Sequence, residues 1–167
     1  MITQRLAKRL VSEFTKRGLT VATAESCTGG LIAKRITDIA GSSAVLSGGF
    51  VTYTNQAKIN LLGVDPAIIE RDTEVSASCA MAMAKGARER LGTAFGVSTT
   101  GFAGPTGGTD IDPVGTVYIG VSTPDGTLYE RFCAPVGSSR AQVRAAAAHR
   151  AIELLFDAIA NLDKNIL

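Results

Sequence analysis

The segment "TVATAESCTGGLIAKRI", residues 20–36, joins a run of small and β-branched residues to an amphipathic run through a polar turn. Residues 20–24 predict a short buried strand, and residues 30–39 predict a helix. A strand that passes directly into a helix is the repeating unit of α/β proteins. The segment therefore predicts an α/β domain, with the cluster Glu25 to Gly30 between the strand and the helix.

The rest of the chain continues this alternation. Ile2, Leu6, Leu10 and Phe14 recur every four residues, which predicts an amphipathic first helix that ends at Gly18. Further strands are predicted over residues 48–55, 94–101, 115–123 and 127–136, and further helices over 56–64, from the N-cap Ser76 to Leu91, and over 137–162.

The turn "PDG" at residues 124–126 joins the last two predicted strands as an antiparallel hairpin. The other predicted strands alternate with helices, which favours parallel pairing among those strands. Together these patterns predict a three-layer α/β/α sandwich around a mixed, mostly parallel five-stranded sheet.

Length and composition favour one folded domain over residues 1–167. The chain has 167 residues, of which 46% are hydrophobic, and its mean hydropathy of +0.20 argues against a disordered chain. No apolar run approaches the roughly 20 residues of a membrane span, and residues 1–20 lack the apolar centre of a secretory signal. The chain is therefore expected to have no membrane partner.

The cysteines indicate the redox compartment, and the net charge bears on the class of partner. Cys27, Cys79 and Cys133 are widely spaced and form no C-x-x-C pair, which predicts free thiols in a reducing cytoplasm. A net charge of +2, 5% aromatic residues and the absence of tryptophan argue against a nucleic-acid partner. The alanine run 145–148 permits close helix packing and favours a homo-oligomer.

Three polar segments follow predicted strands and are expected to meet. In open α/β sheets, ligands bind beyond the carboxyl ends of parallel strands. The segments are "AESCTGG" after the first strand, "TNQAK" after the second and "TTGFAGPTGG" after the third. Parallel pairing would bring all three to one edge of the sheet, which is the expected site.

Ser26 lies at this edge, next to the start of a helix. A helix cap is one explanation for a serine there, and a nucleophile is another. His149 is the only histidine and falls far along the last predicted helix, which argues against a Ser-His-Asp triad and against a zinc site. A lysine with a lowered pKa can replace histidine as the base. Lys58 follows the second strand and is the better candidate than Lys34, and solvated lysines beside a capped helix stay as the alternative.

Other residues near this edge have more than one possible role. Cys27 could form a thiolate at the helix start, and Glu25 could pair with Asp110 or Asp112, or with them hold magnesium. The loop "GPTGG" fits either a tight turn or a ligand loop. The segment "GSSRAQVR" fits either a phosphate site at Ser138, Ser139 and Arg140, or a serine cap with Arg140 and Arg144 in solvent.

Several longer motifs together resemble the CinA C-terminal domain family. They are "TAESCTGG", "DIAGSSAVLSGGFVTYTNQAK", "LLGV", "GFAGPTGG" and "PVGTVY", in that order, and the similarity covers nearly the whole chain. Enzymatic members of this family are the nicotinamide-nucleotide amidases, also called NMN deamidases. The resemblance implies a domain that stands alone rather than fused to a molybdopterin-binding-like half.

The resemblance also implies an activity and a set of site residues. The activity is hydrolysis of the carboxamide of nicotinamide mononucleotide (NMN) to nicotinate mononucleotide and ammonia, with no cofactor and no metal. Ser26 matches the nucleophile and Lys58 the base, with Tyr53 close enough to orient Lys58. The turn after Ser26 is expected to hold the oxyanion, leaving packing to the Cys27 side chain and helix capping to Thr28. The residues expected to bind the substrate are Cys27, Thr28, Gly29, Thr100, Gly104, Gly107 and Arg140.

Two features separate this chain from many relatives. Asp112 stands where they carry lysine before "PVGTV", and "TTGFAG" replaces a more usual "S-x-x-GIAG". The first difference removes a positive charge near a phosphate site. Some members of the family are known only through competence or DNA damage, so the alternative function is a non-catalytic nucleotide-binding module.

Overall fold

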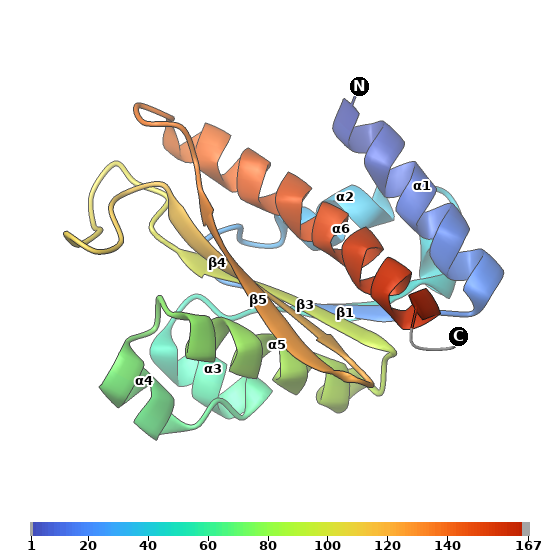
Figure 1. Ribbon diagram of the computed structural model, residues 1–167, viewed down its shortest axis with the longest axis horizontal. Coiled ribbons are helices and arrows are strands. Elements are labelled where there is room, and N and C mark those ends of the chain that lie inside the picture. The colour runs from blue at the N-terminus through green and yellow to red at the C-terminus, as the bar shows by residue number, and fades with distance from the viewer. Residues whose placement is uncertain (1, 165–167) are drawn as a thin grey trace.

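A five-stranded sheet forms the middle layer of the computed structural model, which describes residues 2–164 (Figure 1). The strand order is β2-β1-β3-β4-β5. The strands are β1 (Val21–Glu25), β2 (Leu46–Val51), β3 (Phe95–Gly101), β4 (Thr116–Thr123) and β5 (Gly126–Cys133).

Strand β1 pairs in parallel with β2 and β3, whereas β4 pairs antiparallel with both β3 and β5. Four strands therefore run in one direction and only β4 opposes them. This confirms the predicted mixed, mostly parallel sheet and the predicted hairpin. The three neighbouring parallel strands end at the same edge, as the site prediction requires.

Helices cover both faces of the sheet (Figure 1). One face carries α1 (Ile2–Arg17), α2 (Leu31–Thr37) and α6 (Arg140–Lys164), and the other carries α3 (Asn55–Leu62), α4 (Pro66–Asp72) and α5 (Ala77–Leu91). A short 3-10 helix, Ser42–Ala44, precedes β2. The three-layer α/β/α arrangement is thus confirmed. No helix within residues 2–164 is both long enough and apolar enough to cross a membrane.

The core lies in two apolar clusters, one on each side of the sheet. Under α1, α2 and α6, the rings of Phe14 and Phe95 lie 5.2 Å apart between their centroids. Under α3 and α5, Met83 and Leu62 pack against the alanines of β1. Burial of these side chains drives the association of the layers.

Sequence signals placed most helix ends correctly. Ser76 caps α5 by accepting a hydrogen bond from the Cys79 amide at 3.2 Å, and Gly92 ends that helix in a left-handed conformation. Ser139 and Gln142 exchange bonds as a capping box at the start of α6, at 2.8 and 3.3 Å. The predicted serine cap of the last helix is therefore confirmed.

One helix and several boundaries differ from the prediction; among them, β5 ends at Cys133 rather than at residue 136. Helix α4 was not predicted, although Asp65 caps it by accepting a hydrogen bond from Ala67 N at 2.9 Å and Pro66 occupies its first turn. The helix has seven residues, too few to show a clear apolar period. Strand β2 begins and ends earlier than predicted, because Thr54 caps α3 and Asn55 already belongs to that helix.

Gly86 allows α5 to approach the C-terminal end of α3 closely. A Cβ atom at this position would collide with the carbonyl oxygen of Leu62. Alanine normally stabilises a helix interior relative to glycine by about 1 kcal/mol. Here we expect Gly86→Ala to lower the free energy of unfolding by about 1–3 kcal/mol, the usual cost of overpacking. Urea unfolding measures this, and a gain in stability would contradict the close approach.

Candidate active site

The register of the sheet brings the three predicted site segments together. Glu25, the last residue of β1, pairs with Val51 on β2 and with Thr99 on β3. Strands β1 and β2 therefore end next to each other, and β3 ends two residues further along, at Gly101. This confirms that the segments after the first, second and third strands converge at one edge.

Ser26 and Lys58 meet directly at this edge. The Lys58 Nζ donates hydrogen bonds to Ser26 Oγ at 3.3 Å and to the Thr52 carbonyl oxygen at 3.2 Å. Lys58 lies in α3, and its amine reaches the residues that follow β1 and β2, where only 1% of the residue is exposed. The structure thus places a lysine amine in contact with the serine hydroxyl.

Burial lowers the pKa of Lys58, because an ammonium group loses its hydration in the interior. Interactions with Cys79, Glu74 and Cys27 oppose this shift by favouring the charged form. Lys34, the other lysine considered, is exposed and pairs with Asp38 at 2.6 Å. Of these two lysines, Lys58 is therefore the one that is buried and contacts Ser26.

The carboxylate of Glu25 caps α2 from inside the protein. It accepts hydrogen bonds from the amides of Gly30 at 3.0 Å, Ile32 at 3.0 Å and Ala33 at 2.9 Å, and from the Thr28 hydroxyl at 2.6 Å. These amides are the otherwise unpaired donors at a helix start, where a negative charge is favourable. The prediction that Thr28 caps this helix is wrong, because the amides at the start of α2 donate to the Glu25 carboxylate and not to the Thr28 hydroxyl.

Replacement of this buried carboxylate tests its role in the fold. In Glu25→Gln the new NH2 group faces backbone N–H donors, so charged hydrogen bonds are lost. We expect the free energy of unfolding to fall by about 2–4 kcal/mol. Urea unfolding provides the measurement. Glu89→Gln is the control: its pair with Lys85 is exposed, so the expected change is below about 1 kcal/mol. An equal change in both variants would contradict the capping role.

Arg144, on α6, holds the turn after Ser26 from the other side. Its guanidinium donates to the carbonyl oxygens of Cys27 at 3.1 Å and of Thr28 at 2.9 Å. The sequence suggested a solvated arginine here as one alternative, and the structure shows a half-buried one instead. No local pattern links Arg144 to a turn more than one hundred residues away.

Only part of this turn is free to bind a ligand. The amides of Ser26, Gly29 and Gly30 donate to Thr99, Ser26 and Glu25 respectively, at 2.9, 3.1 and 3.0 Å. Within the described residues, the amides of Cys27 and Thr28 make no hydrogen bond to another residue. Of these two residues only Cys27 lines the pocket, whereas Thr28 is fully buried, so the Cys27 N–H is the donor that the turn leaves for an oxyanion.

The Cys27 side chain is not suited to be a nucleophile. It is 6% exposed and packs in the apolar core. Burial raises the pKa of its thiol to about 12, so the reactive thiolate is scarce at neutral pH. This agrees with the packing role expected for the side chain. All three cysteines are free thiols, as the sequence predicted.

Tyr53 and Arg140 meet at the mouth of the site. Arg140 donates one hydrogen bond to the Tyr53 hydroxyl at 2.7 Å and another to the Gly104 carbonyl oxygen at 2.7 Å. Tyr53 therefore contacts Arg140, whereas the Lys58 amine is held by Ser26 and Thr52. The expectation that Tyr53 orients Lys58 is not met, because the polar contact of its hydroxyl is with Arg140.

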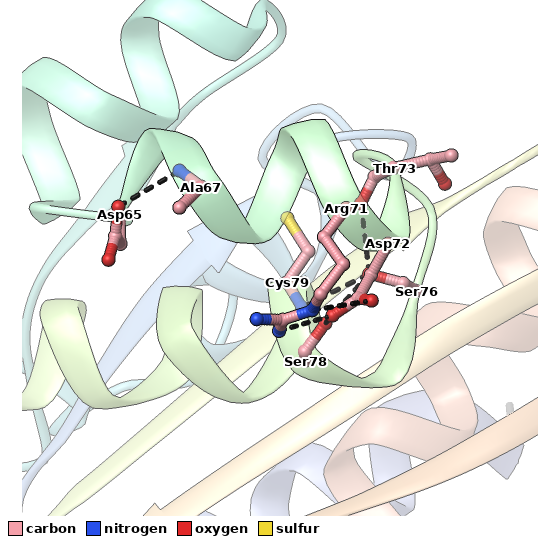
Figure 2. A network of polar contacts seen from close by, with 8 residues as sticks. All are labelled: Asp65, Ala67, Arg71, Asp72, Thr73, Ser76, Ser78 and Cys79. Carbon is pink, nitrogen blue, oxygen red and sulfur yellow. Dashed lines mark hydrogen bonds and ion pairs between the residues drawn. The ribbon is translucent and has the colours of Figure 1, made fainter.

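Thr100 and the segment before α5 form the opposite wall. The Thr100 hydroxyl donates to the Glu74 carbonyl oxygen at 2.6 Å. Figure 2 shows the polar contacts beside Glu74, where Ser76 Oγ donates to the Thr73 carbonyl at 2.9 Å and Ser78 Oγ to Asp72 at 2.7 Å. These hydrogen bonds hold residues 72–78, the segment that leads into α5, both from within and from β3.

These groups enclose a pocket of about 210 Å³. Three of the seven predicted substrate-binding residues line it, namely Cys27, Thr100 and Arg140. Thr28, Gly29, Gly104 and Gly107 do not line the pocket, and Thr28 is fully buried. The complete lining is Ser26, Cys27, Tyr53, Asn55, Lys58, Glu74, Val75, Thr100, Gly101, Phe102, Ala103 and Arg140.

The carboxylate pair considered for metal binding does not form. The carboxylate oxygens of Glu25 already accept hydrogen bonds from the amides at the start of α2. Asp112 accepts hydrogen bonds from Arg131 Nε at 2.8 Å and from the Tyr118 hydroxyl at 3.1 Å. Asp112 thus bonds to an arginine outside the pocket lining. Within residues 2–164, no group of three or more His, Cys, Asp or Glu side chains is placed to hold a metal ion.

A larger cavity, of about 680 Å³, lies between α1 and α6. Its lining includes Arg5, Lys8, Arg9 and His149, whose Nε2 lies 3.4 Å from a carboxylate oxygen of Glu153. None of the three converging segments lines this cavity. The chemical groups, rather than the cavity volume, identify the smaller pocket as the candidate active site.

Comparison with known proteins agrees with this arrangement. The sequence model of the CinA C-terminal domain family matches residues 3–159. The chain belongs to the CinA C-terminal domain family. Among the family's curated members, a CinA-like protein of Chlorobaculum tepidum is 54% identical over 125 residues, which is 74% of this chain and 30% of that protein. The chain thus spans about a third of that relative's length.

Solved structures of the family have the same fold. The competence/damage inducible protein CihA of Agrobacterium tumefaciens is 43% identical and has a TM-score of 0.88, covering 93% of this chain and 94% of that one. The competence damage-inducible protein A of Klebsiella pneumoniae is 31% identical, with a TM-score of 0.90 and coverage of 95% and 97%. The family assignment therefore holds for nearly the whole fold.

Proposed function

We propose that this domain hydrolyses the carboxamide of NMN to nicotinate mononucleotide and ammonia. The observation that carries the proposal is the contact between the buried Lys58 amine and Ser26 Oγ, at 3.3 Å. A serine becomes a nucleophile when a neighbouring base accepts its proton, and a lysine acts as that base once burial favours its neutral form. Membership of the CinA C-terminal domain family supports NMN as the substrate.

The reaction proceeds in two halves. Neutral Lys58 takes the proton of the Ser26 hydroxyl as Oγ attacks the carbonyl carbon of the amide. The Lys58 ammonium then returns that proton to the leaving nitrogen, and ammonia departs as the C–N bond breaks. In the second half Lys58 takes a proton from a water molecule as its oxygen attacks the acyl-enzyme; the C–Oγ bond then breaks, the Lys58 ammonium returns the proton to Ser26 Oγ, and the product leaves as the carboxylate after loss of its acid proton to solvent.

The oxyanion of each tetrahedral intermediate accepts a hydrogen bond from the amide of Cys27, which lines the pocket. The amide of the residue after the nucleophile has this role in other serine hydrolases. The carbonyl group of the same peptide unit belongs to Ser26 and accepts a hydrogen bond from Gly29 N at 3.1 Å. Such a bond polarises the peptide and strengthens its N–H as a donor, so this donor is fixed before the substrate binds.

The product mixture tests the proposed reaction. Purified protein incubated with NMN should release ammonia and nicotinate mononucleotide in equal amounts, measured by an ammonia-coupled assay and by chromatography. NMN binding without ammonia would instead favour a non-catalytic nucleotide-binding module. Neither binding nor ammonia release would remove NMN as the substrate.

A further inference from the structure

Glu74 places a carboxylate without a hydrogen bond or ion pair in the wall of the pocket. It is half-buried and lines the pocket together with Ser26 and Lys58. Its carboxylate makes no hydrogen bond and no ion pair with any residue in the described part of the chain. A carboxylate beside the nucleophile that makes no direct hydrogen bond or ion pair has its oxygen atoms available to a ligand, and its charge acts on Lys58 only at longer range.

The backbone around Glu74 is fixed in place. Thr73 has a φ of 71°, a conformation that residues other than glycine rarely adopt. The hydroxyl of Ser76 bonds to the Thr73 carbonyl and that of Thr100 to the Glu74 carbonyl (Figure 2 draws the Ser76 contact). Glu74 is therefore presented to the pocket by a rigid turn and not by a free loop.

The charges of the pocket are separated. Glu74 lies on the side of Lys58, whose pKa its negative charge raises. Arg140 supplies the positive charge, and its guanidinium is anchored at the mouth by Tyr53 and Gly104. Burial favours the neutral form of Lys58. The pocket thus offers one anion beside the reacting groups and one cation further out.

We propose that Glu74 is a specificity-determining residue that binds the positively charged pyridinium ring of the nucleotide and so selects the oxidised over the reduced nicotinamide. This inference rests on the proposed function. NMN carries a cationic ring next to the scissile amide and an anionic phosphate at its other end, in the same order as Glu74 and Arg140. The carboxylate also repels the carboxylate of the product, which favours its release.

Two ligands that differ in ring charge test this inference. NMN and its reduced dihydronicotinamide form share the amide, ribose and phosphate, but the reduced ring is neutral. In a Ser26→Ala background, which prevents turnover, calorimetry should show NMN binding about tenfold more tightly than the reduced form, as expected for one partly screened charge interaction. Adding Glu74→Gln should weaken NMN about tenfold and change the reduced form less than about twofold.

Glu70→Gln is the matched control, because it removes the same charge from an exposed position on α4. It should leave both affinities unchanged. Equal weakening of both ligands by Glu74→Gln, no weakening of NMN, or the same effect from Glu70→Gln would overturn the inference while the amidase proposal stands. Absence of NMN binding together with absence of ammonia release by the wild type would overturn both.

Discussion

Lys58→Met is expected to lower the rate of ammonia release from NMN at least about a thousandfold, because it removes the base that activates Ser26. Methionine has a similar length and no charge, so it fits the buried space of Lys58 without a desolvation cost. The free energy of unfolding should therefore stay unchanged or rise. Steady-state kinetics and urea unfolding of the same preparation give both quantities.

Lys34→Met is the control for this substitution. Lys34 is exposed and pairs only with Asp38 in the described structure, so its loss should change the rate less than about twofold. A large loss of activity in Lys34→Met, or normal activity in Lys58→Met, would contradict the assignment of Lys58 as the base.

The pH dependence follows from the same residue. Lys58 acts as a base only when it is deprotonated, so the rate should rise with pH through its pKa and then level off. Burial lowers this pKa, and the groups that act against burial are Cys79, Glu74 and Cys27. The plateau should therefore begin below the ordinary lysine range. A rate that still rises with pH through the ordinary lysine range would contradict a buried, readily neutral Lys58.

Ser26→Ala should reduce ammonia release by at least about a thousandfold, because no covalent intermediate can form without the hydroxyl. The hydroxyl touches Lys58 but does not cap α2, whose amides are bound by Glu25. The substitution should therefore leave stability nearly unchanged. The amide of Cys27 and the rest of the pocket lining remain in place, so NMN should still bind.

Ser12→Ala is the matched control for this loss of a hydroxyl. Ser12 is an exposed residue of α1, outside the lining of the active-site pocket. We expect its activity to equal that of the wild type. A similar loss in both serine variants would indicate a general defect of the preparation rather than the loss of a nucleophile.

Local patterns in the sequence were sufficient for most of the fold. The apolar period of α1, the serine cap at Ser76 and the glycine at Gly92 each act within a few residues, so their effects can be inferred from the chain alone. The convergence of the site segments followed from parallel pairing of three consecutive strands. The choice of Lys58 over Lys34 also followed, because Lys34 lies about two turns along the helix that begins after Ser26 and so points away from the site edge.

The support of the site depends on contacts between distant segments and could not be predicted in this way. Arg144 reaches Cys27 from α6, and Arg140 joins Tyr53 to Gly104. Nothing near Glu25 shows that its carboxylate turns inward to cap the helix after it, and serine and threonine were the more common candidates. Glu74 gave no signal either, since the strand-end rule does not include the segment before α5.

The most direct test of the Ser26–Lys58 mechanism compares wild type and Ser26→Ala with NMN under the same conditions, recording ammonia release and NMN binding together. We predict equal amounts of ammonia and nicotinate mononucleotide from the wild type. We predict bound NMN but no ammonia above the uncatalysed rate from Ser26→Ala. Ammonia release by Ser26→Ala at the wild-type rate would contradict the role of Ser26 as the nucleophile.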